Sequence, residues 1–374
     1  MRFGVMTLID NVPDALSGHL LTPHDRLREV VELAVLTEEL GFDAFGVGER
    51  HGAPFLSSSP PAVLGAIAAR THRIRLFTTV TVLSTLDPVR VAEDYATVDQ
   101  LSGGRLELTI GKGNAPEPWH LFHRDPGDQY ALQEENYELL RRLWSEDRVT
   151  WSGRFRPPLK NATVLPRPFR RPPTIWHGSA TSERSVELAA LWGDPVFAAN
   201  VIQPVAAYAK LIDHYRARWA DYGHDPAAAL VASGGTLYAA ADDRTARREF
   251  APYYEAAVAA RDVPGNNTPF RTLDDAADHG PALVGSPARI AGKILSQHVA
   301  YGHALQFFSV DSAGLPFARK AEVLRLTAAE VLPQLRHELP DPLPWPSPAP
   351  AAPPEPAVEA ARWPPRPGRG RQPD

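Results

Sequence analysis

Short apolar runs alternate with amphipathic stretches along the first 337 residues of this 374-residue chain. Residues 3–8, FGVMTL, form a continuous apolar run with the length of a buried strand. Residues 24–40 then carry apolar side chains at helical spacing, and Gly41 marks the end of that stripe. A buried strand followed by an amphipathic helix is the repeating unit of α/β proteins with parallel sheets.

This unit of strand and helix recurs through the body of the chain. We predict strands over residues 3–8, 42–47, 74–83, 105–110, 174–177, 195–199, 230–238 and 304–310. We predict helices over residues 24–40, 60–71, 88–101, 128–144, 181–192, 203–222, 242–261, 286–300 and 317–336. Eight such units over roughly 330 residues favour an α/β fold of the closed (β/α)8 type, a TIM barrel with insertions. An open doubly wound sheet is the alternative, because periodicity alone does not separate the two.

Residues 338–374 differ from the rest in composition, with 13 prolines among 37 residues. So proline-rich a segment buries too little apolar surface to offset the entropy lost on ordering, and it is expected to be disordered or polyproline-like. We therefore predict a barrel domain over 1–337 and a flexible Pro-rich tail over 338–374. Arginines near its end suggest a weak docking element, but a solvated appendage is the favoured interpretation.

Composition narrows the function classes. The chain is 44% apolar and 22% charged, and its formal charge of -5 offers no general attraction to nucleic acid or to an anionic membrane. It has no cysteine, which excludes disulfides and thiolate chemistry. No apolar run approaches the ~18 residues of a membrane span, and no signal segment opens the sequence, so we expect a cytoplasmic protein. The histidines show no metal-binding spacing, and we expect no metal.

Polar and glycine-rich segments follow four consecutive predicted strands. They are residues 48–52, 82–88, 111–116 and 177–182. In a (β/α)8 barrel the carboxyl ends of the strands meet at one face, where the active site lies. The sequence therefore predicts a site for an elongated anionic ligand at that face.

Two of these segments suit a phosphate group. Lys112 lies between two glycines, where the backbone can approach a ligand closely and the ammonium can pair with it. Ser179 and Ser182 lie where a helix begins, and free N–H groups there attract anions. A simple helix N-cap is the alternative for the serines, and an exposed loop lysine is the alternative for Lys112. The spacing matches neither a Walker loop nor a GxGxxG motif.

Glu49, Arg50 and His51 place three ionisable side chains together after the second strand. A histidine there can act as a general base, because an imidazole titrates near neutral pH, at ~6.5. The alternative is an ion pair between Glu49 and Arg50, with His51 capping the loop.

Residues 39–51, ELGFDAFGVGERH, and 82–114, from VLSTLDPVRV to TIGKGN, resemble the bacterial luciferase-like flavin-dependent monooxygenases. The resemblance extends over residues 1–336 and implies a TIM barrel that takes reduced FMN as a cosubstrate, usually from a separate flavin reductase. It implies reaction with O2 and oxygenation of a small organic substrate. A branch of the superfamily uses a deazaflavin for hydride transfer instead, and a flavin-binding protein without turnover is a third possibility.

The resemblance also implies roles for individual residues. Lys112, Gly113 and Asn114 correspond to the loop that contacts flavin and its phosphate. The fifth strand tip supplies further phosphate contacts, from the Gly178 backbone and from Ser179 and Ser182. Thr79 and Val80 correspond to a non-proline cis peptide beneath the flavin ring.

One position departs from the family pattern, which often reads Glu-His-His at the second strand tip. Arg50 replaces the first histidine, and only His51 remains. An arginine is always protonated and accepts no proton, so luminescent aldehyde oxidation is not expected, while flavin monooxygenation is. We further expect residues 263–285, which show little periodicity, to form an irregular, mobile lid. A homodimer is one possibility, because barrels of the family often pair, and no residue of the chain decides the oligomeric state. Three aromatic residues are candidate substrate-pocket walls, with ordinary core packing as the alternative for each: Phe55, Trp119 and Phe122.

Overall fold

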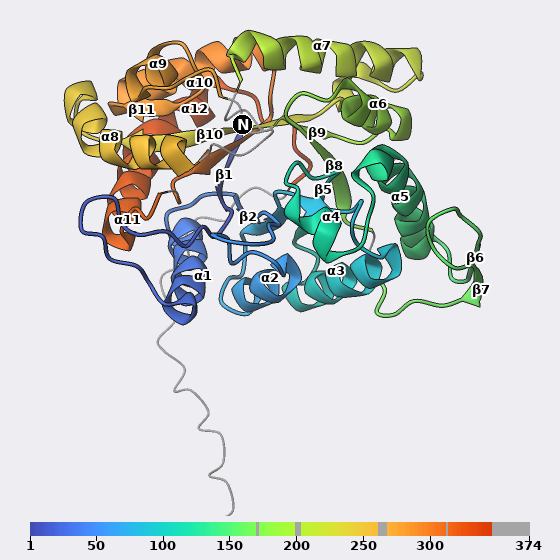
Figure 1. Cartoon of the computed structure of the whole chain (residues 1–374). Helices are drawn as coiled ribbons and strands as arrows, with labels where there is room; N and C mark the ends of the chain where they lie inside the picture. The colour runs from blue at the N-terminus through green and yellow to red at the C-terminus, as the bar shows by residue number, and fades with distance from the viewer. Residues whose placement is uncertain (170–171, 199–202, 261–267, 312, 346–374) are drawn as a thin grey trace, which may run out of the picture.

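Eight parallel strands close into a barrel in the computed structural model, which describes residues 1–169, 172–198, 203–260, 268–311 and 313–345 (Figure 1). The barrel strands are β1 (Arg2–Thr7), β2 (Ala44–Val47), β3 (Arg75–Thr78), β5 (Leu106–Gly111), β8 (Thr174–Ser179), β9 (Val196–Ala198), β10 (Val231–Ala239) and β12 (Leu305–Ser309). Each pairs with two neighbours, and β1 joins β2 on one side and β12 on the other. The closed TIM barrel is confirmed, and the open sheet is excluded.

Helices surround this barrel (Figure 1). They are α1 (Pro23–Glu39), α2 (Pro60–Ala68), α3 (Pro88–Ser102), α4 (Glu117–Leu121), α5 (Gln129–Ser145), α6 (Glu183–Trp192), α7 (Val205–Asp221), α8 (Asp243–Ala260), α9 (Leu273–Asp278), α10 (Pro287–Tyr301), α11 (Phe317–Leu326) and α12 (Leu332–Glu338). Several begin at a side chain that accepts a backbone N–H of the first turn, as Thr22, Asp87 and Ser286 do. None of the described helices combines the length and apolar composition of a membrane span.

The third predicted strand, over residues 74–83, is divided in the structure. β3 ends at Thr78, a cis peptide joins Thr79 to Val80, and β4 (Thr81–Val82) then pairs with the end of β5. The predicted cis peptide is therefore present. Apolar periodicity runs unbroken through this segment, so the sequence pattern contains no sign of the division.

The segment expected to be an irregular lid, residues 263–285, contains regular structure where it is described. Residues 261–267 lie outside the described chain. The remainder holds α9 and β11 (Leu283–Gly285), and β11 pairs in parallel with the end of β10. Leu273 and Leu283 are buried in the core. The irregular lid is therefore wrong for residues 273–285, whose two elements are too short to show periodicity.

The chain stays packed on the barrel past the expected domain boundary at residue 337. The amino group of Met1 donates to the carbonyl oxygens of Leu339 and Pro340, and Arg2 pairs with Asp341 at 2.6 Å. Leu343 is buried against the barrel interior, and the Trp345 indole N–H donates to Glu107 Oε1 at 3.1 Å. The packed body thus continues to Trp345 and covers the amino end of the barrel, while residues 346–374 lie outside the described chain.

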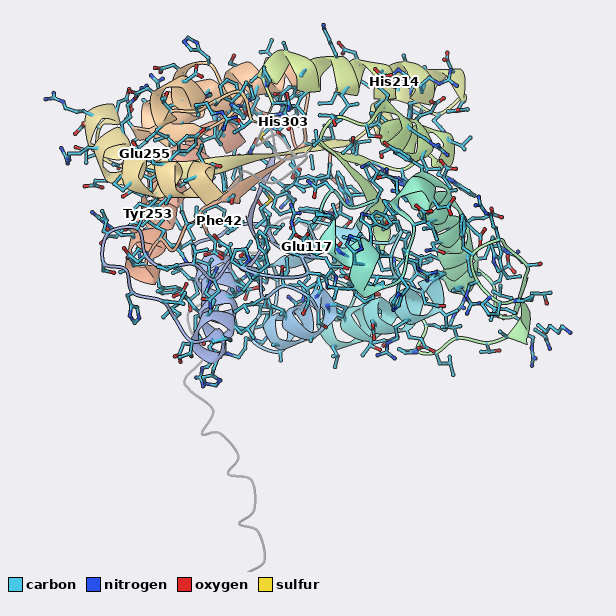
Figure 2. The ribbon with its side chains drawn as sticks, in the orientation of Figure 1. Phe42, Glu117, His214, Tyr253, Glu255 and His303 are labelled. Atoms are coloured by element: carbon cyan, nitrogen blue, oxygen red, sulfur yellow. The ribbon has the colours of Figure 1, made fainter. Side chains whose placement is uncertain are left out.

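Aromatic side chains fill the part of the barrel interior that lies away from the carboxyl ends of the strands. The Phe77 ring contacts Trp176 and Phe307, and Phe197 also packs edge-on against Phe307. Side chains fill the layer between strands and helices as well (Figure 2). The β6–β7 hairpin (Val149–Trp151, Leu159–Ala162) lies outside the barrel, beside α5. Toward the carboxyl ends of the strands the large rings give way to small residues, and the candidate site lies there.

Candidate active site

Glycines surround the cis peptide between Thr79 and Val80. A Cβ atom on Gly48 would lie 2.5 Å from the Thr79 carbonyl oxygen, and one on Gly111 would lie 2.9 Å from Val80 Cγ2. A Cβ on Gly178 would overlap Val80 Cγ1. The tips of β2, β5 and β8 therefore lack side chains at the points where Thr79 and Val80 project between them. Gly178, one of the predicted site residues, leaves room for the Val80 side chain because it has no Cβ. Only its backbone is available to contact a ligand.

The Glu49 carboxylate contacts both His51, on the loop after β2, and Val82, at the end of β4. Its Oε1 lies 2.8 Å from His51 Nε2, and its Oε2 accepts the Val82 N–H at 2.9 Å. Arg50 points elsewhere and donates to Asn114 Oδ1 at 2.8 Å. The alternative of an ion pair between Glu49 and Arg50 is therefore wrong, because Glu49 pairs with the histidine instead.

Lys112 lies beside the first turn of α5. Its Nζ donates to Gln129 Oε1 at 3.0 Å and lies 5.4 Å from the centroid of the Tyr130 ring. The Tyr130 hydroxyl lies 3.0 Å from Ser182 Oγ. Gln129 and Tyr130 thus connect the two predicted phosphate-binding tips. Sequence reasoning missed both residues, although each lies at the start of the helix that follows the Lys112 tip.

The serines at the β8 tip organise the start of α6. Ser179 Oγ donates to the Ser182 carbonyl oxygen and accepts the Ser182 N–H, both at 3.0 Å. Ser182 Oγ accepts the Ser185 N–H at 3.2 Å, so the N-cap interpretation of Ser182 is confirmed. Because Ile110 pairs with His177, Lys112 and Ser179 each lie two residues beyond the same pair of β5 and β8. The predicted residues of the two tips are therefore neighbours.

Most of the other predicted residues border one small cavity of about 60 Å³. Its lining consists of Glu49, Arg50, His51, Thr79, Val80, Val82, Gly113, Asn114, Ala115 and Pro118. Two candidate aromatic walls touch these residues: Phe122 packs edge-on against His51, and Phe55 lies under the Arg50 guanidinium. The third, Trp119, is buried in α4 next to the lining residue Pro118.

A second cavity, of about 380 Å³, lies beside the ends of β1 and β12 and has buried charges in its wall. Arg26 pairs with Asp311 at 2.5 Å, and Lys320 pairs with Asp311 at 2.6 Å and with Glu29 at 2.7 Å. Burial would raise the pKa of Asp311, but Lys320 and Arg26 hold it below its ordinary value. Burial and the Asp311 charge raise the pKa of Asp10 to about 6. This cluster links the loop that follows β1 to the loop that follows β12.

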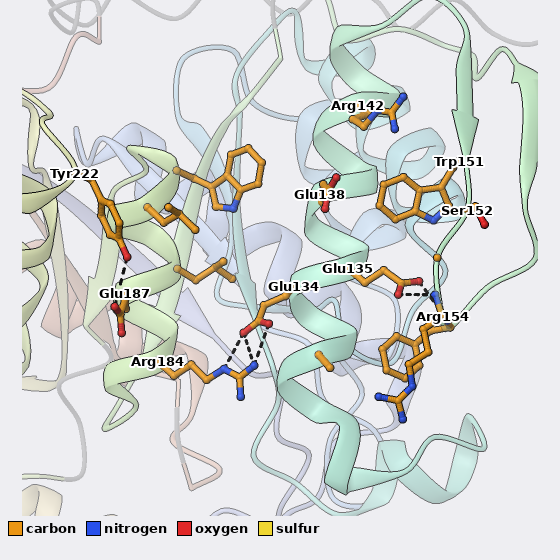
Figure 3. A pocket seen from close by; sticks show the side chains of 16 residues that line it. Glu134, Glu135, Glu138, Arg142, Trp151, Ser152, Arg154, Arg184, Glu187 and Tyr222 are labelled. Atoms are coloured by element: carbon orange, nitrogen blue, oxygen red, sulfur yellow. Dashed lines mark hydrogen bonds and ion pairs between the residues drawn. The ribbon is translucent and has the colours of Figure 1, made fainter.

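A groove of about 890 Å³ runs outside the barrel between α5, α6 and the β6–β7 hairpin (Figure 3). Several of its charged groups are paired within the protein: Arg184 donates to both oxygens of Glu134, and Glu135 accepts the backbone N–H groups of Arg154 and Phe155. None of the predicted site residues lines it. Within the described residues, no group of three or more side chains is arranged to hold a metal ion.

Several known proteins resemble this chain in sequence or in fold. The profile of the luciferase-like monooxygenase family matches residues 1–303. The 4-hydroxyprotoasukamycin monooxygenase of Streptomyces nodosus subsp. asukaensis is 36% identical over 118 residues, 31% of this chain and 32% of that protein. An F420-dependent glucose-6-phosphate dehydrogenase of Intrasporangium calvum is 35% identical over 159 residues, 38% of this chain and 45% of that protein.

A solved structure is also similar to this chain, over most of its length. The monooxygenase RslO1 from Streptomyces bottropensis superposes with a TM-score of 0.79 at 29% identity, over 89% of this chain and 99% of that one. The curated relatives are matched over less than two thirds of their own length, so their sequences support the shared barrel more than any one reaction. Because the family profile covers most of the sequence, the chain belongs to the luciferase-like monooxygenase family.

Proposed function

We propose that this protein is an oxidoreductase that uses reduced FMN and O2 to oxygenate a small organic substrate, with the reduced flavin supplied by a separate reductase. One observation carries the proposal. Lys112, Tyr130 and Ser182 come together at the tips of β5 and β8, next to a cis peptide that glycines enclose. A cation and two hydroxyls suit a terminal phosphate, and the residues around the small cavity beside Thr79 and Val80 would border the flavin ring.

In this proposal the phosphate replaces a weaker partner of Lys112. The ammonium donates to a neutral amide oxygen of Gln129 and to the Gly113 carbonyl oxygen. A phosphate oxygen is a stronger acceptor for this ammonium than an amide oxygen, because it carries a negative charge and adds ionic attraction to the hydrogen bond. Ser179 orders the loop through the Ser182 backbone, and the start of α6 directs its positive end toward the same place.

The remaining site residues then border the flavin ring. Thr79 and Val80 would lie beneath it, and Gly113 and Asn114 beside it. Bound FMN supplies the reduced ring that reacts with O2. His51 can accept or donate a proton there, whereas Arg50 stays cationic and can stabilise an anionic flavin or an acidic substrate.

Anaerobic titration with reduced FMN tests this assignment. We expect Lys112→Met to weaken binding by about 10-fold or more, since a hydrogen bond to a charged group contributes about 1.5–3 kcal/mol. Lys160→Met, which removes the same charge from the exposed hairpin, serves as the matched control and should bind normally. Equal binding by wild type, Lys112→Met and Lys160→Met would contradict the proposed phosphate site.

A second candidate is hydride transfer with a deazaflavin. It is favoured by the 35% identity to an F420-dependent glucose-6-phosphate dehydrogenase over 159 residues. The same barrel and the same phosphate-binding tips would serve either cofactor. Titration of the wild-type protein with reduced FMN and with reduced F420 separates the two, because only the second candidate requires tighter binding of F420 and no reaction with air.

A further inference from the structure

The carboxylate of Glu49 lies at the centre of the candidate site, between the tip of β2 and β4. The side chain is 2% exposed, and both oxygens are engaged. Its backbone N–H also donates to the Val80 carbonyl oxygen at 2.9 Å. Glu49 therefore contacts Val80, which precedes β4, and Val82, which ends β4, and it holds His51 from the same position.

The Glu49 contact determines which nitrogen of His51 carries the proton. An ionised carboxylate only accepts hydrogen bonds, so the nitrogen that faces it, Nε2, must be the donor. In a neutral imidazole the other nitrogen, Nδ1, then keeps a lone pair. Among the described residues, none forms a hydrogen bond with His51 Nδ1, and His51 lines the cavity beside Thr79 and Val80.

The ring orientation is held from a second side. Phe122 packs edge-on against the His51 ring, with centroids 4.9 Å apart and planes at 82°. A ring held by a carboxylate at one nitrogen and by an aromatic edge cannot exchange its two nitrogens without breaking both contacts. In histidines that transfer protons, the hydrogen bond made by one ring nitrogen determines the tautomer and the orientation of the ring.

We propose that Glu49 is a positioning residue that fixes His51 with its proton on Nε2, so that Nδ1 is the atom that exchanges protons in the cavity. This inference deepens the proposed function, on which it rests, by assigning the proton-accepting atom and the residue that prepares it. Glu49 acts through His51 rather than on the ligand. Arg50, which lies between them in sequence, is directed to Asn114 and takes no part in this contact.

The substitution Glu49→Gln keeps the size of the side chain but replaces one acceptor oxygen with an NH2 donor. The amide oxygen of the glutamine can still accept the Val82 N–H, while its NH2 group faces His51. Nε2 must then become the acceptor, which moves the imidazole proton to Nδ1. Glu135→Gln is the matched control, because Glu135 also accepts backbone N–H groups but lies on α5 away from the cavity.

Nitrogen-15 NMR of the histidine rings reads the tautomer directly and needs no flavin. The His51 signals are assigned by their loss in His51→Asn. We expect a protected Nε2–H in the wild type and in Glu135→Gln, and an Nδ1–H in Glu49→Gln. A wild-type His51 protonated on Nδ1, or a His51 tautomer unchanged by Glu49→Gln, overturns the proposal. If Glu49→Gln does not fold, the wild-type and Glu135→Gln spectra still test the first expectation.

Reoxidation of bound reduced FMN in air supplies a second readout. We expect Glu49→Gln to slow it about 10-fold, less than the roughly 100-fold or more of a complete general acid–base contribution because His51 itself remains, with the Kd for reduced FMN within about twofold of wild type. The double variant with His51→Asn should be no slower than His51→Asn alone, because the two residues act as a unit. Additive effects would overturn the proposal. Failure of wild-type protein to bind reduced FMN, by contrast, overturns the proposed function and leaves the tautomer result standing.

Discussion

The Tyr130 hydroxyl lies 3.0 Å from Ser182 Oγ and joins the first turn of α5 to the N-cap of α6. The same tyrosine ring contacts two cations, Lys112 at 5.4 Å and Arg184 at 4.8 Å from its centroid. One aromatic side chain therefore links the two strand tips that were expected to share a phosphate.

Tyr130→Phe removes this hydroxyl and keeps the ring. We expect reduced FMN to bind about 2- to 10-fold more weakly, because a neutral hydrogen bond contributes about 0.5–1.5 kcal/mol. The melting temperature should change little, because the hydroxyl is at a half-exposed site. Tyr222→Phe, on the outer groove, provides the comparison and should bind flavin as the wild type does. Loss of flavin affinity in both variants would contradict a specific role for Tyr130.

Gly178→Ala tests the glycine enclosure around the cis peptide. The added methyl overlaps Val80 Cγ1, so we expect a loss of about 1–3 kcal/mol in the free energy of unfolding, typical of overpacking, together with weaker flavin binding. Gly65→Ala is the matched control, because a Cβ there meets no atom within 4 Å on helix α2. That control should be neutral or stabilising, since alanine favours the helix by up to about 1 kcal/mol. Urea unfolding of both variants measures the difference.

Trp345→Ala tests whether the segment after α12 supports the barrel. The ring packs against Phe77 and Arg75, and its N–H binds Glu107, so we expect a loss of about 2 kcal/mol in the free energy of unfolding. Trp345→Phe keeps an aromatic ring at that position and should lose less. Thermal and urea unfolding measure both variants, and wild-type stability in Trp345→Ala would show that this end of the barrel needs no cover.

Asp10 should make stability depend on pH. Its folded-state pKa is raised from 3.8 to about 6, so the native state binds its proton more tightly than the unfolded chain does. Stability from this group is present below about pH 4 and is lost as the pH rises toward 6. As the pH rises across that window, we expect the free energy of unfolding of Asp10→Asn to increase relative to that of the wild type, by up to about 3 kcal/mol at pH 7. Urea unfolding at several pH values measures the gap, and a pH-independent gap would refute the expectation.

Local patterns in the sequence specify most of the fold and the location of the site. Strand and helix periodicities depend on neighbouring residues, so they predict the eight βα units and place Lys112, Ser179 and His51 at strand tips. The same segments carry the family resemblance, and only that resemblance implies the cis peptide of Thr79 and Val80. These features are readable without the structure because each depends on a short stretch of chain.

The tertiary structure decides which of these side chains meet. Closure of the barrel brings the Glu49 carboxylate to the Val82 N–H, and it brings Tyr130 into contact with both Lys112 and Ser182. It also gives Trp345 a buried partner in Glu107, although the surrounding proline-rich composition predicts a free tail. Such contacts depend on distances between strands and helices far apart in sequence, and no local pattern encodes those distances.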